Sequence, residues 1–200
     1  MLDSRLRDEM VFYATTGDYS DAPRYEKFAL DCKLDEKGAE IGRMVHFLLR
    51  LMSHLPEPIQ ILETASATGL TAAGVKAQLT YARIDNVYTS LDIEPNLLEY
   101  ARARDRGDRF VQSDFERLPF ANDMFDVYIM MAAEGYRPRG TFYSEVHRVL
   151  RPRGFYVMPQ IGPHPYVGIE EKYAVLRAGL CIAQAEDYLI AQKSENFTLG

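Results

Sequence analysis

The chain has 200 residues, of which 47% are hydrophobic and 26% charged, and its formal net charge is −6. A chain of this length can bury a sizeable apolar core, so we expect one domain. The acidic balance argues against a nucleic acid as the main partner. The segment RARDRGDR at 102–109 is locally basic, and we interpret it as a solvated helix end and loop.

Cysteine and histidine are sparse in this sequence. Cys32 and Cys181 are too few and too far apart for a disulfide scaffold, and the histidines lack the spacing of metal ligands. The first ten residues are charged, and the longest apolar runs are shorter than a bilayer span. We therefore expect a cytoplasmic protein without a membrane partner, a metal or a targeting segment.

The first 58 residues have a helical pattern. Apolar residues recur every three or four positions over 36–55, and the prolines of PEP at 56–58 end that pattern. A shorter helix is predicted over 23–31, after a turn-rich segment with several tyrosines. We interpret residues 1–58 as a helical cap or lid that belongs to the same domain as a core over 59–200.

From residue 59 the pattern changes to short apolar runs that alternate with helical stretches. Strands are predicted over 59–63, 87–91, 109–112, 125–131 and 154–159, and helices over 70–81, 95–103 and 140–150. Such alternation indicates βαβ units and a mostly parallel sheet with helices on both faces. Two adjoining apolar runs, 180–187 and 188–194, predict an antiparallel hairpin at the sheet edge.

Acidic residues follow the first three predicted strands, where an open parallel sheet binds its ligands. Glu63 precedes a turn of small residues that ends at Gly69, and small residues let a ligand approach the backbone. Asp92 comes 23 residues after Gly69, which suits a carboxylate that binds ribose hydroxyls. Ser113-Asp114-Phe115 follows the third strand and combines hydrogen-bond acceptors with an aromatic ring, as an adenine site requires.

Four segments in this order resemble the motifs of the class I S-adenosylmethionine-dependent methyltransferases: ILETASATG, VYTSLDIEPNLLEYAR, FVQSDFERLPFANDMFDVYIM and SEVHRVLRPRGFYVM. The resemblance implies a Rossmann-like fold with a mostly parallel seven-stranded sheet, a C-terminal antiparallel hairpin, and S-adenosyl-L-methionine as cofactor. By the same resemblance, Asp92 would hold the ribose, Ile93 would flank the adenine and Asp114 would accept from its amino group. Glu63 and the 65–69 turn would face the methionine part. The expected cofactor-binding residues are Glu63, Thr64, Ala65, Ser66, Ala67, Gly69, Asp92, Ile93, Ser113, Asp114 and Phe115.

The turn departs from the family pattern of acid, apolar residue and Gly-x-Gly-x-Gly. Ala65 and Ala67 stand at the first two glycine positions, and Gly69 alone is retained. Alanine costs about 1 kcal/mol or more where φ must be positive. Its methyl group also occupies space beside the ligand, so we expect weakened but retained cofactor binding.

No dedicated catalytic residue is required, because methyl transfer depends mainly on in-line approach and desolvation. Candidates for the acceptor site are Glu134 and Tyr136 after the fourth strand and His164 after the fifth, although each is also a plausible plain loop residue. Tyr19 and Tyr25 are expected to close over the site from the N-terminal helices.

These features favour a methyltransferase that acts on a small-molecule acceptor. Partial closure of the site by a second subunit, giving a homodimer, is a further hypothesis. Two alternatives stay open: a non-catalytic binding or scaffold protein whose cofactor turn has degenerated, and an NAD-dependent oxidoreductase with the same strand-turn-helix-acid order. The GxGxxG pattern of the second alternative is absent from the sequence.

Overall fold

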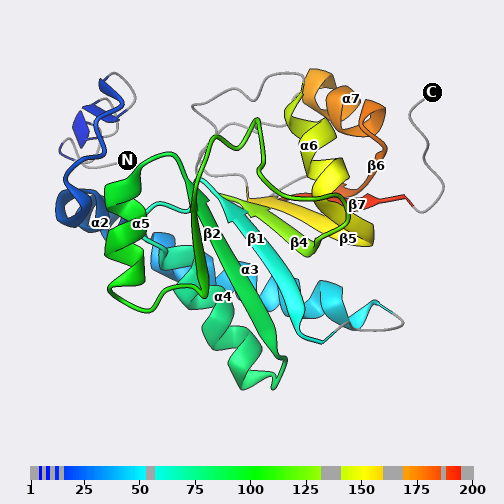
Figure 1. Cartoon of the computed structure of the whole chain (residues 1–200), viewed down its shortest axis with the longest axis horizontal. Helices are drawn as coiled ribbons and strands as arrows, with labels where there is room; N and C mark the ends of the chain where they lie inside the picture. Colours follow the sequence, from blue (N-terminus) through cyan, green and yellow to red (C-terminus); the bar gives the residue numbers. More distant parts are fainter. Residues whose placement is uncertain are drawn as a thin grey trace.

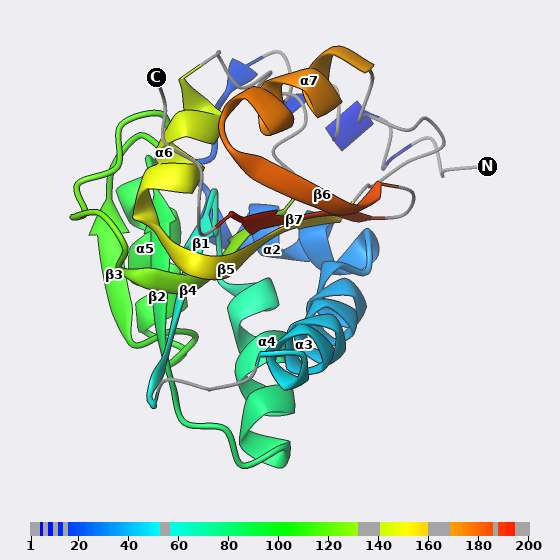
Figure 2. The same cartoon turned by 90° about the vertical axis from the view of Figure 1, so that its right-hand side faces the viewer.

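A seven-stranded sheet with helices on both faces forms the protein (Figures 1 and 2). The computed structural model describes residues 16–52, 57–131, 141–159, 169–185 and 188–194, together with Arg5, Asp8, Glu9, Phe12 and Tyr13. The strands are β1 (Ile59–Thr64), β2 (Asn86–Asp92), β3 (Arg109–Gln112), β4 (Phe125–Met130), β5 (Leu150–Pro159), β6 (Leu180–Ala185) and β7 (Tyr188–Lys193). The helices are α2 (Ala22–Asp31), α3 (Leu34–Arg50), α4 (Leu70–Tyr81), α5 (Pro95–Arg102), α6 (Phe142–Val149) and α7 (Ile169–Arg177).

The strand order is β3-β2-β1-β4-β5-β7-β6. β1 to β5 pair in parallel, while β7 pairs antiparallel with both β5 and β6. The order reverses between β1 and β4, which is the place where doubly wound sheets bind ligands at the carboxyl ends of their strands. The predicted fold class, including the C-terminal hairpin at the sheet edge, is confirmed.

Alternating strand residues build one core on each face of the sheet. Leu62 and Tyr128 lie in a cluster with the buried side of α6, whereas the neighbouring Ile61 and Val127 pack with α3 and α4. All four strand side chains are fully buried. Because successive strand side chains point to opposite faces of the sheet, α3 and α4 cover one face and α6 covers the other (Figure 2).

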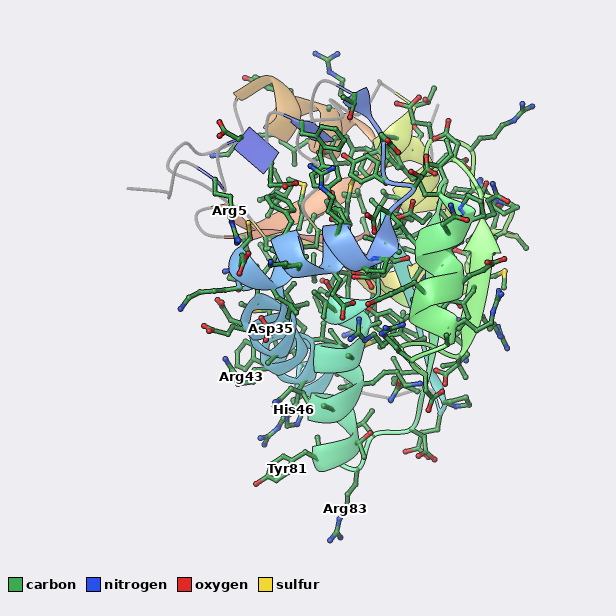
Figure 3. The ribbon with its side chains drawn as sticks, turned by 90° about the vertical axis from the view of Figure 1, so that its left-hand side faces the viewer. Arg5, Asp35, Arg43, His46, Tyr81 and Arg83 are labelled. Carbon is green, nitrogen blue, oxygen red and sulfur yellow. The ribbon has the colours of Figure 1, made fainter. Side chains whose placement is uncertain are left out.

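Glycines bring α3 and α4 into close contact. A Cβ at Gly74 of α4 would lie 2.5 Å from the Gly38 carbonyl carbon and the Ala39 nitrogen of α3. A Cβ at Gly42 of α3 would lie 2.8 Å from the Gln78 side chain of α4. Figure 3 shows the outer side of this pair, where Arg43 and His46 of α3 and Tyr81 of α4 project away from the body. The close packing fixes α3 directly against α4, the helix that follows the turn after β1.

The predicted elements agree with the observed ones except in three places. The helical pattern over 36–55 corresponds to α3, which ends at Arg50, five residues before the predicted end. β5 begins at Leu150, four residues before the predicted strand, because Leu150 already pairs with Phe125 across a register shift in β4. α7 was not predicted, since Tyr173 and Leu176 leave about half of their surface exposed and blur the amphipathic pattern. The division into a cap over 1–58 and a core over 59–200 remains a prediction.

No helix in the described segments has both the length and the apolar character needed to cross a bilayer. Within the same segments, no group of three or more histidine, cysteine or acidic side chains is arranged to hold a metal ion.

Candidate functional site

The turn after β1 keeps a glycine-type backbone although two of its glycine positions are alanine. The φ angles are 52° at Ala65, 45° at Ala67 and 75° at Gly69. The left-handed region costs an L residue roughly 1–2 kcal/mol, so both alanines are strained. Two backbone bonds hold the turn: Ser66 N–H donates to Leu91 O at 3.1 Å, and Gly69 N–H donates to Ser66 O at 2.9 Å.

Asp92 links this turn to the beginning of α5. Its Oδ2 accepts from Ala67 N–H at 2.8 Å and its Oδ1 accepts from Glu94 N–H at 3.0 Å. Burial raises the pKa of the Asp92 carboxyl, while the bonds from Glu94 and Ala67 oppose that shift. A carboxylate has about four lone-pair sites, so Asp92 keeps acceptor capacity for a ligand hydroxyl beside its bonds from Glu94, Ala67 and Ile93. Asp92 thus shapes the turn and can also bind a ligand.

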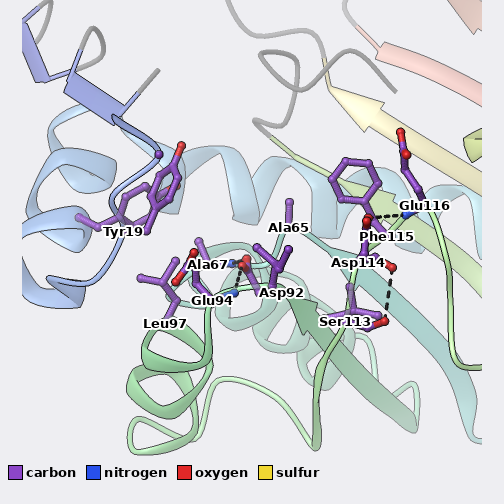
Figure 4. A pocket seen from close by; sticks show the side chains of 14 residues that line it. Tyr19, Ala65, Ala67, Asp92, Glu94, Leu97, Ser113, Asp114, Phe115 and Glu116 are labelled. Atoms are coloured by element: carbon purple, nitrogen blue, oxygen red, sulfur yellow. Dashed lines mark hydrogen bonds between the residues drawn. The ribbon is translucent and has the colours of Figure 1, made fainter. Parts of the chain in front are cut away.

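A cavity of about 490 Å³ opens beside Asp92, at the carboxyl ends of β1, β2 and β3 (Figure 4). Its volume lies in the range of roughly 300–1,000 Å³ that small-molecule sites occupy. Nine of the predicted site residues line it: Tyr19, Tyr25, Ala65, Ala67, Asp92, Ile93, Ser113, Asp114 and Phe115. The structure adds Gly17, Leu91, Glu94, Leu97 and Glu116. Of these, Leu97 lies in the first turn of α5, directly after the segment that contains Asp92 and Ile93.

The segment that follows β3 forms another wall of the cavity, beside the turn after β1 and the end of β2. Ser113 N–H donates to the Asp92 carbonyl at 3.0 Å, which fixes this segment beside the end of β2. Asp114 Oδ1 accepts from Glu116 N–H at 2.9 Å, and the Phe115 ring meets Phe142 edge-on with centroids 5.6 Å apart. An acceptor and an aromatic ring therefore lie side by side, as expected.

Glu63 lies behind the turn and not in the large cavity. It is 1% exposed and its Oε2 accepts from Tyr88 Oη–H at 2.9 Å. Burial raises the pKa of Glu63 to about 8, against the opposing effect of the Tyr88 hydrogen bond. At neutral pH this side chain is therefore mostly protonated and uncharged.

A second cavity of about 20 Å³ adjoins Glu63 and is large enough for one water molecule. It shares Tyr25, Ala65 and Ala67 with the large cavity, so the alanine turn stands between the two. Ser66 also lines it, and the buried Ser66 Oγ has no hydrogen-bond partner among the described residues.

Two predicted cofactor residues line neither the large cavity nor the small one. Thr64 is fully buried, and its Oγ1 donates to Tyr128 Oη at 3.0 Å, which is a contact within the core. Gly69 packs against the loop after α5, because a Cβ there would lie 2.9 Å from Arg106 Cβ. Thr64 and Gly69 thus contact other parts of the protein, and a direct role for them in cofactor binding remains a prediction.

Tyr19 and Tyr25, which are expected to close over the site, both line the cavity, and their closing role remains a prediction. Tyr19 stacks on Tyr13 with ring centroids 5.1 Å apart, and Tyr25 meets Tyr19 edge-on at 5.5 Å. The aromatic cluster thus places two tyrosines of the N-terminal segment against a site formed by residues 65–116. Three further candidates, Glu134, Tyr136 and His164, lie outside the described residues.

Comparison with known proteins matches the central part of the chain. Residues 62–158 match the family model described as a methyltransferase domain. The chain is 37% identical over 112 residues to the phthiotriol/phenolphthiotriol dimycocerosates methyltransferase of Mycobacterium leprae, covering 54% of this chain and 40% of that protein. It is 30% identical over 113 residues to a fatty-acid O-methyltransferase of Mycolicibacterium smegmatis, covering 55% of this chain and 38% of that protein. The chain thus spans about two fifths of the length of these curated relatives.

A solved structure extends the likeness over almost the whole chain. A Methanococcus maripaludis protein assigned as an S-adenosyl-L-methionine-dependent methyltransferase superposes with a TM-score of 0.68 at 12% identity, covering 90% of this chain and 94% of that one. At this identity the likeness shows the fold. Together with the matched domain and the curated relatives, it shows that residues 62–158 form a methyltransferase domain with the fold of the class I S-adenosylmethionine-dependent methyltransferases.

Proposed function

We propose that this chain binds S-adenosylmethionine in the 490 Å³ cavity and transfers its methyl group to a small-molecule acceptor. The observation that carries the proposal is the wall formed by Asp92 and Ile93 at the carboxyl end of β2. Ile93 is 61% exposed, although it is a large apolar side chain that lines a cavity. An apolar surface beside a buried carboxylate suits a nucleoside, which has a ring to cover and hydroxyls to bind.

The residues of the cavity would divide the work of holding the cofactor. Asp92 offers its free lone pairs to the ribose hydroxyls, Ile93 and Leu97 cover one side of the adenine, and Asp114 accepts from the adenine amino group. Glu63 and the alanine turn would face the methionine part. When bound, the cofactor supplies an electrophilic methyl group on a sulfonium.

The protein's own contribution to transfer would be positioning and exclusion of water. Tyr19 and Tyr25 would cover the cavity from the solvent side, since both already line it. The family relatives named above act on phthiotriol dimycocerosates and on fatty acids, which supports a small molecule as acceptor. Glu134, Tyr136 and His164 remain our candidates for the acceptor side.

Two further parts of the proposal concern the protein's setting. Completion of the acceptor side by a second subunit would appear as a dimer in sedimentation velocity. A cytoplasmic location is supported by the free thiols of Cys32 and Cys181, which suit a reducing compartment.

Calorimetric titration with S-adenosylmethionine and S-adenosylhomocysteine tests cofactor binding. Asp92→Asn replaces an acceptor oxygen by an NH₂ group that cannot accept from the backbone N–H of Ala67 or Glu94, and we expect affinity to fall by about tenfold or more. Asp85→Asn is the matched control, because Asp85 is exposed at the other end of β2. That variant should bind as the wild type does.

The titration also separates the alternatives. Absence of heat with either ligand would contradict the proposal and favour a non-catalytic domain. Binding of NADH in place of these ligands would favour the oxidoreductase.

A further inference from the structure

Arg106 connects two parts of the site that are distant in sequence. Its guanidinium donates to Glu26 Oε2 of α2 at 2.5 Å and to Glu26 Oε1 at 3.2 Å. The same group donates to the carbonyl of Thr68, within the cofactor turn, at 3.0 Å. The side chains of Arg106 and Glu26 are only 18% and 12% exposed. This residue belongs to the basic segment 102–109, so its burial corrects our interpretation of that whole segment as solvated.

The geometry requires an arginine. A guanidinium presents several N–H donors in one plane, so it can bind both carboxylate oxygens and a backbone carbonyl at once. The single ammonium of lysine cannot reproduce that arrangement. Both charges are largely withdrawn from water, so removal of either one leaves the other without its partner.

Arg106 also holds the turn by a second contact, beside that of Asp92. Asp92 binds the N–H of Ala67, and Arg106 binds the carbonyl of the next residue, Thr68. A turn with two strained alanines needs such support, because each would relax to negative φ if it were released. The turn's remaining glycine, Gly69, packs against Arg106 itself.

On its other side, Arg106 fixes the lid. Glu26 directly follows Tyr25, which lines both cavities, and Tyr25 contacts Tyr19. Movement of Glu26 away from Arg106 would therefore shift one wall of the site.

We propose that Arg106 is a positioning residue that couples the lid helix α2 to the cofactor turn, so that the two order together when the ligand binds. This coupling goes beyond the proposed function. Its calorimetric test rests on that function, because it requires that the protein binds S-adenosylhomocysteine. In the absence of ligand, the same coupling makes the lid and the turn open together.

Hydrogen exchange and calorimetry on the whole chain test this inference. In Arg106→Gln without ligand, we expect faster exchange in both 17–31 and 65–69. The dissociation constant for S-adenosylhomocysteine should rise by about tenfold or more, since a charged hydrogen bond that positions the turn is lost. Arg106→Lys should recover only part of the affinity.

Glu26→Gln attacks the same pair from the lid side and serves if Arg106→Gln does not fold. In this variant, faster exchange should extend to the turn, although Glu26 does not touch it. The double variant Glu26→Arg with Arg106→Glu should bind S-adenosylhomocysteine more tightly than predicted by adding the binding losses of the two single charge reversals. Lys76→Gln is the control, because it removes the neighbouring Lys76–Asp108 ion pair and should leave binding unchanged.

A purely structural role would lower the unfolding midpoint but leave the ligand affinity and the exchange of the lid as in the wild type. That result, or faster exchange in the turn alone, overturns the coupling. If the wild type binds no ligand, the proposed function fails, while the ligand-free exchange still decides whether the lid and the turn are coupled.

Discussion

Ala65 and Ala67 are residues whose side chains oppose their own backbone conformation, since both have positive φ. Glycine would relieve roughly 1–2 kcal/mol of strain and lose about 0.4–1 kcal/mol through the greater entropy of the unfolded chain. We therefore expect each of Ala65→Gly and Ala67→Gly to raise the free energy of unfolding by about 0.5–1 kcal/mol in urea titrations. Ala77→Gly, at an exposed position within α4, should instead lower it by about 1 kcal/mol. If the free energy of unfolding changed in the same direction at Ala65, Ala67 and Ala77, the inferred backbone strain would be contradicted.

Glu63 makes stability depend on pH in an unusual direction for an acid. Its pKa is about 8 in the folded protein and 4.5 ordinarily, so between these values the folded state binds more protons than the unfolded state. Its contribution is thus complete below pH 4.5 and is lost as the pH rises towards 8. Relative to the wild type, Glu63→Gln should gain up to roughly 1 kcal/mol per pH unit over this range. Urea unfolding at several pH values checks this, with exposed Glu99→Gln as control; parallel profiles for Glu63→Gln and wild type would refute it.

At this scale the sequence predicted which residues lie at the strand ends but not how they are used. Asp92, Ser113 and Asp114 reach the cavity because the position after a parallel strand is fixed by the alternation of elements. The burial of Glu63 depends on Tyr88 of the neighbouring strand, and no local pattern encodes that contact.

The α3–α4 pair depends on the absence of side chains at its contact. Gly74→Ala would ordinarily stabilise a helix by about 1 kcal/mol. Here the added methyl would lie 2.5 Å from backbone atoms of α3, which cannot move aside as a flexible side chain can. We expect a net loss of about 3 kcal/mol or more in the free energy of unfolding, with α4 and the turn before it displaced. Ala77→Ser, on the exposed side of α4, should change stability by less than about 0.5 kcal/mol; a comparable small change at Gly74 would show that the helices can separate freely.

Elements were predictable where local periodicity and packing agree. α4 and β3 have the predicted bounds, because turn residues flank both segments. The position of β7 between β5 and β6 arises from tertiary pairing, and so does the link from Glu26 of α2 through Arg106 to Thr68 in the turn after β1. The basic segment 102–109 shows the limit of composition, since Arg106 has the same charge as its solvated neighbours but a buried partner.

At the scale of the whole molecule, the site joins segments from residue 17 to residue 116, so a bound ligand should stabilise the chain as a unit. At one hundred times the dissociation constant, binding to the folded state alone adds about 2.7 kcal/mol. For a domain of this size, each kcal/mol raises the unfolding midpoint by roughly 2–4 °C. S-adenosylhomocysteine at that concentration should therefore raise the midpoint by about 5–10 °C in calorimetric scans, and adenosine at the same concentration should raise it less because it lacks the amino-acid part. Asp92→Asn should require more ligand for the same shift, whereas Asp85→Asn should follow the wild type. An unchanged midpoint at saturating ligand would mean that the unfolded chain binds equally well or that the cavity does not bind this ligand, and either result is incompatible with a site assembled by the fold.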